Sequence, residues 1–149
     1  MKDEHYYNYS YGHGLEGGIR TVVELWCEDP AAAKHQYGPI ASWDTSEITS
    51  MGWLFDNKAG FNADISRWDV SSVTDMGYML TGATSFNGDL SQWDVSKVTH
   101  MQYMLMGATS FTHQLDGAWS TSTARKTRMF YDCPGSIAGK TNDANGTPE

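Results

Sequence analysis

Apolar residues recur along this chain at an interval of 25 positions. Four blocks of equal length align without a gap: 36–60, 61–85, 86–110 and 111–135. In the second block, apolar and polar residues alternate from Phe61 to Ile65, which predicts a short strand. Apolar residues then follow at helical spacing from Val73 to Leu80, which predicts a short helical turn. Each block is therefore predicted to form a strand and a helical turn joined by corners.

The same chemical character returns in each column of this alignment. The apolar columns are Ile40, Ile65, Leu90 and Leu115; Leu54, Met79, Met104 and Met129; Phe55, Leu80, Leu105 and Phe130; Trp43, Trp68 and Trp93; Ile48, Val73 and Val98; and Met51, Met76 and Met101. A unit of this size cannot bury its apolar side alone, so successive blocks are expected to stack. The predicted fold class is an α/β repeat solenoid, a short leucine-rich-repeat-like stack of four 25-residue coils with an N-terminal helical cap.

The fourth block departs from the pattern. Trp119 is displaced by one position from the Trp column, and Lys126 stands in a Met column. Such decay is expected of a terminal repeat, because its outer face has no neighbouring repeat to bury it.

The blocks also set the predicted domain organisation. Residues 1–14 are expected to be a flexible Tyr- and Gly-rich leader, 15–35 a helical N-terminal cap, 36–135 the four repeats and 136–149 a flexible C-terminal tail.

Within the predicted cap, Ile19, Val22, Val23 and Trp26 share one helical face. A second short helix is predicted from three punctuating residues: Asp29 as N-cap, Pro30 at the first helical position and Gly38 beyond the end.

Composition and charge narrow the function classes. Hydrophobic residues make up 40% of the chain and aromatic residues 13%, which excludes a fully disordered protein. The formal net charge is −8, whereas nucleic acids and anionic membranes attract cationic surfaces. We therefore expect protein partners, with no nucleic acid and no direct membrane insertion. Cys27 and Cys133 fall in the cap and the last block, so they are predicted not to form a disulfide.

We considered several candidate chemical sites. The segment GHGLEG, with Gly12, Gly14 and Gly17, matches G-x-G-x-x-G but lacks the preceding buried strand of a dinucleotide site. The aspartate columns offer oxygen ligands for calcium, but no calcium-loop motif accompanies them. We expect one column, Asp44, Asp69 and Asp94, to cap turns, and the column of Asp64 and Asp89 to point to solvent.

Two further columns are expected to have local roles. The hydroxyls of Thr49, Thr74 and Thr99 are expected to stabilise a corner, and His100 is expected to pair with Asp75 of the preceding repeat. No nucleophile elbow, catalytic Cys-His pair or zinc spacing occurs in the sequence. The chain is therefore predicted not to be an enzyme and to hold neither a cofactor nor a metal.

The two middle blocks carry a recognisable signature. The segments FNADISRWDVSSVTDMGYML and FNGDLSQWDVSKVTHMQYML resemble the W-D-[VT]-S-x-V-T-x-M repeat of the BspA-like leucine-rich repeat surface proteins. The resemblance covers residues 36 to about 130, although two of the four blocks have Met-Leu where Met-Phe is usual. It implies a parallel leucine-rich-repeat fold. Because members include cell-surface proteins and adhesins, it also implies a cell-surface or secreted location.

Fold and resemblance together predict a non-catalytic protein-binding or adhesion module. Its expected contact surface is the outer strand face, formed by Asp64, Asp89 and Gln114; Ser66, Ser91 and Asp116; and Ser42, Arg67 and Gln92. The last of these columns varies most, and variation on a fixed scaffold is how a repeat surface gains specificity. The alternative function is a structural or linker subunit of a larger assembly, attached through the Tyr-rich leader.

Overall fold

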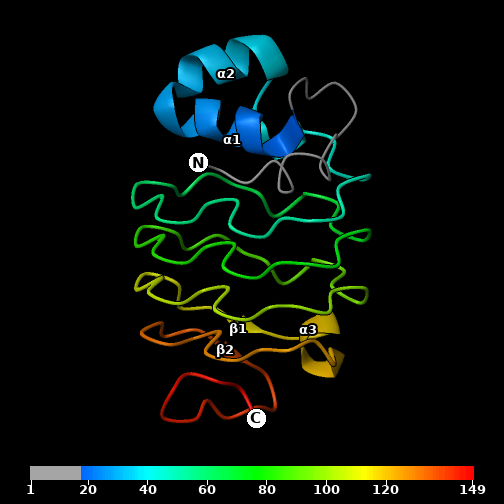
Figure 1. The fold of residues 1–149 in the computed structure, drawn as a ribbon, viewed down its shortest axis with the longest axis vertical. Helices are drawn as coiled ribbons and strands as arrows, with labels where there is room; N and C mark the ends of the chain where they lie inside the picture. Colours follow the sequence, from blue (N-terminus) through cyan, green and yellow to red (C-terminus); the bar gives the residue numbers. More distant parts are fainter. Residues whose placement is uncertain (1–17) are drawn as a thin grey trace.

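The computed structural model describes residues 18–149 (Figure 1). The predicted leader and the GHGLEG segment lie outside the described residues. The elements, in chain order, are α1 (Gly18–Glu28), α2 (Pro30–Tyr37), a 3₁₀ turn η2 (Ile40–Ser42), β1 (Gln114–Leu115), α3 (Ala118–Thr121) and β2 (Ser136–Ile137).

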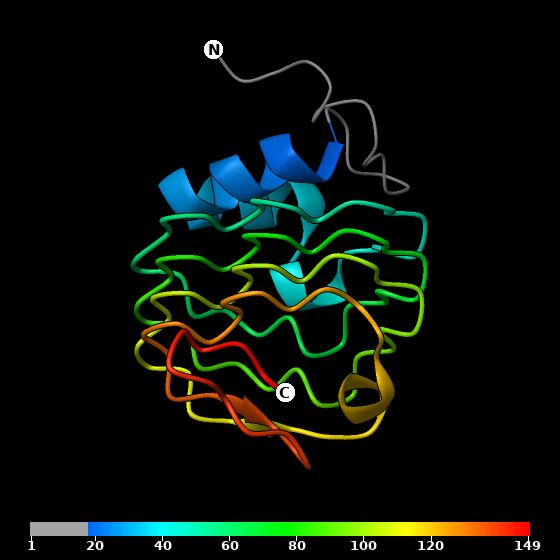
Figure 2. The same ribbon diagram turned by 60° about the horizontal axis from the view of Figure 1, so that its bottom comes forward.

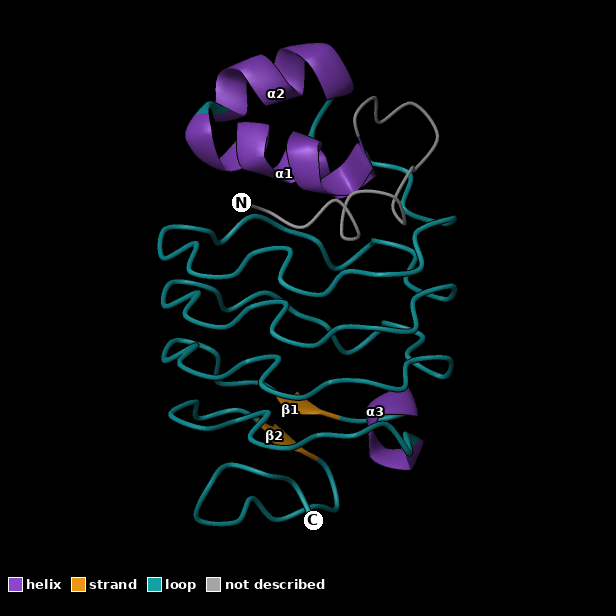
Figure 3. Cartoon of the chain, in the orientation of Figure 1, coloured by secondary structure: helices purple, strands orange, loops and turns teal. Residues whose placement is uncertain are grey.

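The predicted fold class is wrong. We expected an α/β leucine-rich-repeat solenoid whose four coils each contain a strand and a helical turn. Among the described residues, the structure instead has a single sheet of two strands, each two residues long. Residues 43–113 contain turns and isolated bridges, with neither helix nor strand (Figure 3). The short-range apolar patterns arise from a succession of tight turns, which place side chains inward at intervals that mimic strand and helix.

The 25-residue interval reappears in the backbone hydrogen bonds. Trp53 N–H donates to the Gly77 carbonyl at 3.0 Å, Tyr78 N–H to the Gln102 carbonyl at 3.0 Å and Tyr103 N–H to the Thr127 carbonyl at 2.9 Å. Alternate residues on either side of these make equivalent bonds. The turn-rich segments therefore lie side by side, each running across the long axis of the molecule and followed by the next along it (Figure 1).

Two walls enclose the hydrophobic core. We call residues 50–57, 75–82, 100–107 and 125–132 the Tyr wall. Residues 61–69, 86–94 and 111–119 form the Asp wall. Phe55 of the Tyr wall stacks on Phe61 with ring centroids 4.0 Å apart and lies 5.8 Å from Trp68. Figure 2 shows that each pass of the chain bends back on itself to form these two sides. Every residue of the six apolar columns is buried, which confirms the predicted core.

Buried tryptophans tie the repeats together through their indole N–H groups. Trp68 donates to the Ile40 carbonyl at 2.8 Å, Trp93 to the Ile65 carbonyl at 3.1 Å and Trp119 to the Leu90 carbonyl at 2.9 Å. Trp119 therefore occupies the structural position equivalent to Trp68 and Trp93, although it is displaced by one residue in the sequence. Gly117, at φ +61°, and the short helix α3 absorb the one-residue shift.

Helices α1 and α2 cover the N-terminal end. Ile19, Val22 and Val23 of α1 are buried as predicted, and the half-buried Trp26 packs edge-on against Trp43 at 5.7 Å. The cap chemistry of α2 is also confirmed, since the Asp29 carboxylate accepts the Ala32 N–H at 3.0 Å.

The C-terminal residues close the other end of the molecule. β2 pairs in parallel with β1. The Phe130 N–H donates to the Gly146 carbonyl at 2.8 Å, and the Arg128 N–H donates to the Thr147 hydroxyl at 2.8 Å. The polar sequence 136–149 predicts a tail, but these contacts bury Leu115 and Ile137 completely. The C-terminal segment 136–149 therefore covers the outer face of the fourth repeat, which we had expected to have no neighbour.

We expect Trp93→Phe to lower the free energy of unfolding by at least about 2 kcal/mol. The substitution removes the indole N–H from the buried Ile65 carbonyl and leaves a small cavity. Trp53→Phe is the matched control, because Trp53 is 40% exposed and should change stability by about 0.5 kcal/mol or less. Urea denaturation followed by circular dichroism measures both values. Equal losses would contradict the role of the indole hydrogen bond.

We expect Gly146→Ala to destabilise the C-terminal segment more than Gly139→Ala. Both glycines have positive φ, +73° and +77°, so both substitutions carry about 1–2 kcal/mol of backbone strain. A methyl group at Gly146 would also overlap the backbone of Phe130 and Tyr131, whereas the space at Gly139 is open. We expect a further loss of about 1–3 kcal/mol at Gly146 alone. Hydrogen exchange at the Phe130 N–H checks whether the segment has detached.

Candidate functional site

The nine residues of the predicted contact surface lie on the Asp wall and its N-terminal extension. Seven of them are exposed, and Ser66 and Ser91 are half-buried. The structure joins two of the predicted columns, because the Asp64 carboxylate accepts both the N–H and the hydroxyl of Ser66, at 2.9 and 2.6 Å. Gln114 belongs to β1, and the Ser42 hydroxyl donates to the Pro39 carbonyl at 2.8 Å.

Both aspartate columns cap turns, whereas we expected this of only one. Asp44, Asp69 and Asp94 accept the N–H two residues further on, as predicted. Asp64 and Asp89 do the same, so they do not simply point to solvent. Hydrogen bonds from the serine hydroxyls, and then from the serine N–H groups, lower the pKa of Asp64, Asp89 and Asp94. The local role of these carboxylates is thus to hold the corners of the Asp wall.

The predicted side-chain pair of Asp75 and His100 is wrong. Their backbones are bridge partners, but His100 Nδ1 contacts the Thr99 hydroxyl at 2.9 Å and Asp75 Oδ1 accepts the Gly77 N–H at 2.8 Å. Each side chain therefore contacts a group in its own turn instead of the side chain of the neighbouring repeat. The corner role of the threonines is confirmed, because the Thr74 and Thr99 hydroxyls donate to carbonyls of the preceding repeat at 3.2 and 3.1 Å.

We searched the described residues for metal-binding clusters and for reactive thiols. No group of three or more His, Cys, Asp or Glu side chains among residues 18–149 is placed to hold a metal ion. Within that range there is also no helix long and apolar enough to cross a bilayer. Cys27 and Cys133 are free thiols, which confirms that they are not bonded to each other. Burial raises the pKa of Cys133 to about 11 and also raises that of Cys27, so both lack thiolate character at neutral pH.

The Tyr wall carries an aromatic ladder that the sequence analysis missed. We give this name to Trp53, Tyr78 and Tyr103, which occupy one column of the repeat. The rings of Trp53 and Tyr78 stack with centroids 3.8 Å apart and 5° between planes, and those of Tyr78 and Tyr103 at 4.7 Å and 13°. Trp53 is 40% exposed, and the two tyrosines are half-buried. The 25-residue spacing was the available signal, but the fourth member of the column is Arg128.

All four residues of this column have an unusual backbone. Their φ values are +65° at Trp53, +59° at Tyr78, +59° at Tyr103 and +53° at Arg128. Each is the third residue of a tight turn, as shown by the bond from Met79 N–H to the Met76 carbonyl around Tyr78. Glycine or asparagine normally fills such a position, because a side chain there costs about 1–2 kcal/mol. Large side chains at four successive strained positions mark this column as a candidate functional site.

In the two columns beside the ladder, the residue type changes from one repeat to the next. One contains Ser50, Asp75, His100 and Arg125, and the other contains Asp56, Thr81, Met106 and Tyr131. The Asp75 carboxylate lies against Gly52 and Gly77, directly before the ladder residues. On the opposite side, the Arg128 guanidinium lies over the Tyr131 ring at 5.6 Å, which places the second column next to the ladder. Tyr131 is 44% exposed.

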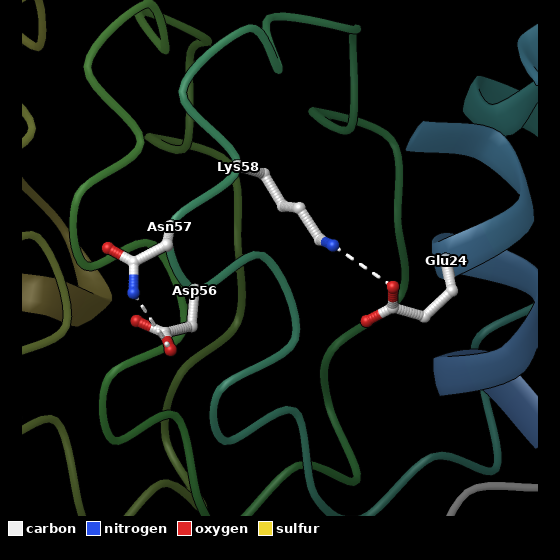
Figure 4. Close-up of polar contacts among 4 residues, drawn as sticks. All are labelled: Glu24, Asp56, Asn57 and Lys58. Atoms are coloured by element: carbon white, nitrogen blue, oxygen red, sulfur yellow. Dashed lines mark hydrogen bonds and ion pairs between the residues drawn. The ribbon is translucent and has the colours of Figure 1, made fainter. Parts of the chain in front are cut away.

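Polar contacts anchor the N-terminal end of the Tyr wall to α1. The Lys58 ammonium donates to Glu24 Oε2 at 3.0 Å, and the Arg20 guanidinium donates to the Gly52 carbonyl. Figure 4 shows Lys58 directed toward Glu24 while Asp56 faces Asn57. Burial raises the pKa of Asp56, and the nearby Lys58 partly offsets this effect. Helix α1 thereby fixes the turn that presents Trp53.

We expect Tyr78→Gly to be more stable than Tyr78→Ala by about 1 kcal/mol. Both variants lose the stacked ring, but only glycine adopts the positive φ of this position without strain. At Gln92, which has no positive φ, alanine should instead equal or exceed glycine in stability. Thermal denaturation of the four variants tests this reversal of order. The same order at both positions would contradict the strained conformation at Tyr78.

Comparison with known proteins gives a family. The family model described as "Mycoplasma protein of unknown function, DUF285" matches residues 29–141. This match includes the ladder, both walls and all of α2. Searches of curated proteins and of solved structures found no match. Because the match covers well over half of the chain, the protein belongs to the DUF285 family.

Proposed function

We propose that this chain is a non-catalytic protein-binding or adhesion module, and that the aromatic ladder is the centre of its contact surface. The observation that carries the proposal is the stack of the exposed Trp53 and the half-buried Tyr78 and Tyr103 at strained backbone positions on the surface. Trp, Tyr and Arg dominate the energetically important residues of protein interfaces. The ladder column and its immediate neighbour Tyr131 supply all three.

The ladder is also well prepared for binding. The backbone of each ladder residue is hydrogen-bonded to the next repeat, and each ring is held by its neighbour. A rigid aromatic side chain loses little conformational entropy when a partner covers it. The strain of the positive φ angles is offset by ring stacking, worth about 0.5–1.5 kcal/mol per pair.

The geometry of the rings favours a protein partner over a carbohydrate. Sugars pack against the open face of an aromatic ring, but stacking covers both faces of Tyr78 and one face each of Trp53 and Tyr103. Ring edges and tyrosine hydroxyls remain at the surface, and these suit the mixed apolar and hydrogen-bonding contacts of a protein interface.

The resemblance of the two middle repeats to BspA-like proteins supports a cell-surface or secreted setting for this binding. The predicted Asp-wall surface, which includes Asp64, Arg67 and Gln92, is the second candidate contact surface on the same module. Its carboxylates are already engaged in their own turns, so the ladder is the stronger candidate.

We expect a double variant, Tyr78→Gly with Tyr103→Gly, to lose most of its ability to capture protein from extracts of the native source. Glycine removes the rings while suiting the backbone, so the variant should fold. Arg67→Ala with Gln92→Ala is the matched control on the Asp wall and should capture as the wild type does. Quantitative pull-down compares the three proteins. Loss of capture in the control alone would move the contact surface to the Asp wall, and absence of any captured protein would contradict the proposed function.

A further inference from the structure

The surface around the ladder has opposite charge at its two ends. Asp56 and Asp75 are the charged residues of the segments 50–57 and 75–82, whereas the segment 125–132 has Arg125, Lys126 and Arg128 against the single acidic residue Asp132. His100 lies between them in the third repeat. The aromatic rings therefore occupy the middle of a surface that is acidic toward the N-terminal end and basic toward the C-terminal end.

The two arginines form no ion pair within residues 18–149. Arg128 contacts the Tyr131 ring, and the Arg128 N–H, not its guanidinium, reaches Thr147. Both arginines are exposed, in a chain whose formal net charge is −8. Cations next to exposed aromatic rings are the groups that a partner's acidic and aromatic side chains would meet.

We propose that this surface binds a second copy of the chain in antiparallel orientation, around a twofold axis that lies across the ladder between the second and third repeats. This inference rests on the proposed function and names a partner for the same ladder. A twofold interface must be self-complementary, because each residue of one copy meets its symmetry-related position in the other. The arrangement of charges and rings on this surface meets that condition.

The antiparallel arrangement places no two like charges opposite each other. It brings Trp53 of one copy opposite Arg128 of the other, and this contact forms twice by symmetry. Tyr78 lies opposite Tyr103 of the second copy, and Asp75 opposite His100. In this arrangement the column of Asp56 and Tyr131 faces the same column of the second copy. Asp56, which lies beside Trp53, therefore also approaches the second copy's Arg128.

The parallel arrangement is disfavoured by the same groups. It would set Arg128 opposite Arg128 and Trp53 opposite Trp53, so the basic ends of the two copies would repel each other. Like charges placed together at an interface are costly and suppress the wrong orientation. The charge distribution thus selects one of the two possible twofold pairings.

The contact is small, so the dimer is expected to be weak. Neighbouring rings of the ladder are only 3.8 and 4.7 Å apart, and the face spans four repeats. Interfaces well below about 1,000 Å² are typical of transient complexes. Association should therefore depend on concentration and weaken as salt screens the charged pairs.

Charge exchange along the ladder column tests this proposal. Trp53→Arg places a cation opposite Arg128 of the second copy, and Arg128→Glu replaces the cation opposite Trp53. We expect each single variant to raise the dimer dissociation constant about tenfold or more in sedimentation equilibrium. The native Arg128 occupies the same strained turn as Trp53, so arginine suits position 53.

The double variant, with both changes in one chain, separates the two orientations. In the antiparallel dimer the new side chains at positions 53 and 128 lie opposite each other with unlike charge, so association should recover. In the parallel dimer each new side chain would face the identical side chain of the second copy, and repulsion between like charges would weaken association further. Lys97→Glu, which makes the same change of charge at an exposed position outside both walls, is the control and should leave association unchanged.

Three outcomes would overturn the proposal: a wild-type chain that stays monomeric up to about 1 mM, a double variant that fails to recover, or an equal effect of Lys97→Glu. Failure here is distinguishable from failure of the proposed function. If the wild type is monomeric while the glycine double variant still loses captured protein, the ladder binds a different protein. If self-association follows the predicted pattern while capture does not depend on the ladder, the second copy is its partner and the broader binding role falls.

Discussion

Most hydrogen bonds between the repeats of the Tyr wall run in one direction, and the rest of the structure depends on them. In this series each donating N–H belongs to one repeat and each accepting carbonyl to the repeat that follows, as in the bonds from Trp53 to Gly77 and from Tyr78 to Gln102. Only His100 and Arg125, at the edge of the wall, donate their N–H groups to the preceding repeat. An extended strand alternates its donors and cannot make such a series with one neighbour. Positive φ at every ladder residue turns the peptide groups so that they can. The strained backbone of the ladder is therefore a requirement of the fold as well as a feature of the site.

A one-directional series leaves carbonyls unpaired at one end and N–H groups unpaired at the other. The chain resolves both ends with segments outside the repeats. At the N-terminal end, Arg20 of α1 donates to the Gly52 carbonyl. At the C-terminal end, the Gly146 carbonyl and the Thr147 hydroxyl accept the N–H groups of Phe130 and Arg128. Because unpaired buried peptide groups are costly, these terminal segments are part of the folding unit.

The sequence predicted the interior of this protein better than its backbone. Burial of columns such as Ile65, Leu90 and Leu115 depends only on which side chains avoid water, and a 25-residue period reveals that directly. The strand and the helical turn were wrong because consecutive turns reproduce the short spacings of both elements. The ladder was missed because its strain is a property of φ, which the identity of Trp53 or Tyr78 does not disclose. The terminal contacts of Gly146 were missed because polar composition says nothing about a docked backbone.

The indole hydrogen bonds of the buried tryptophans bear on how such a chain could lengthen. Trp68 and Trp93 each reach a carbonyl 28 residues earlier, so every repeat carries its own attachment to the one before it. Duplication of a whole 25-residue unit after Ser85 would reproduce these bonds together with the donors and acceptors of the Tyr wall. The new unit would also add one more aromatic residue to the ladder. Evolution could thus vary the reach of the binding surface in whole steps while leaving both closing segments untouched.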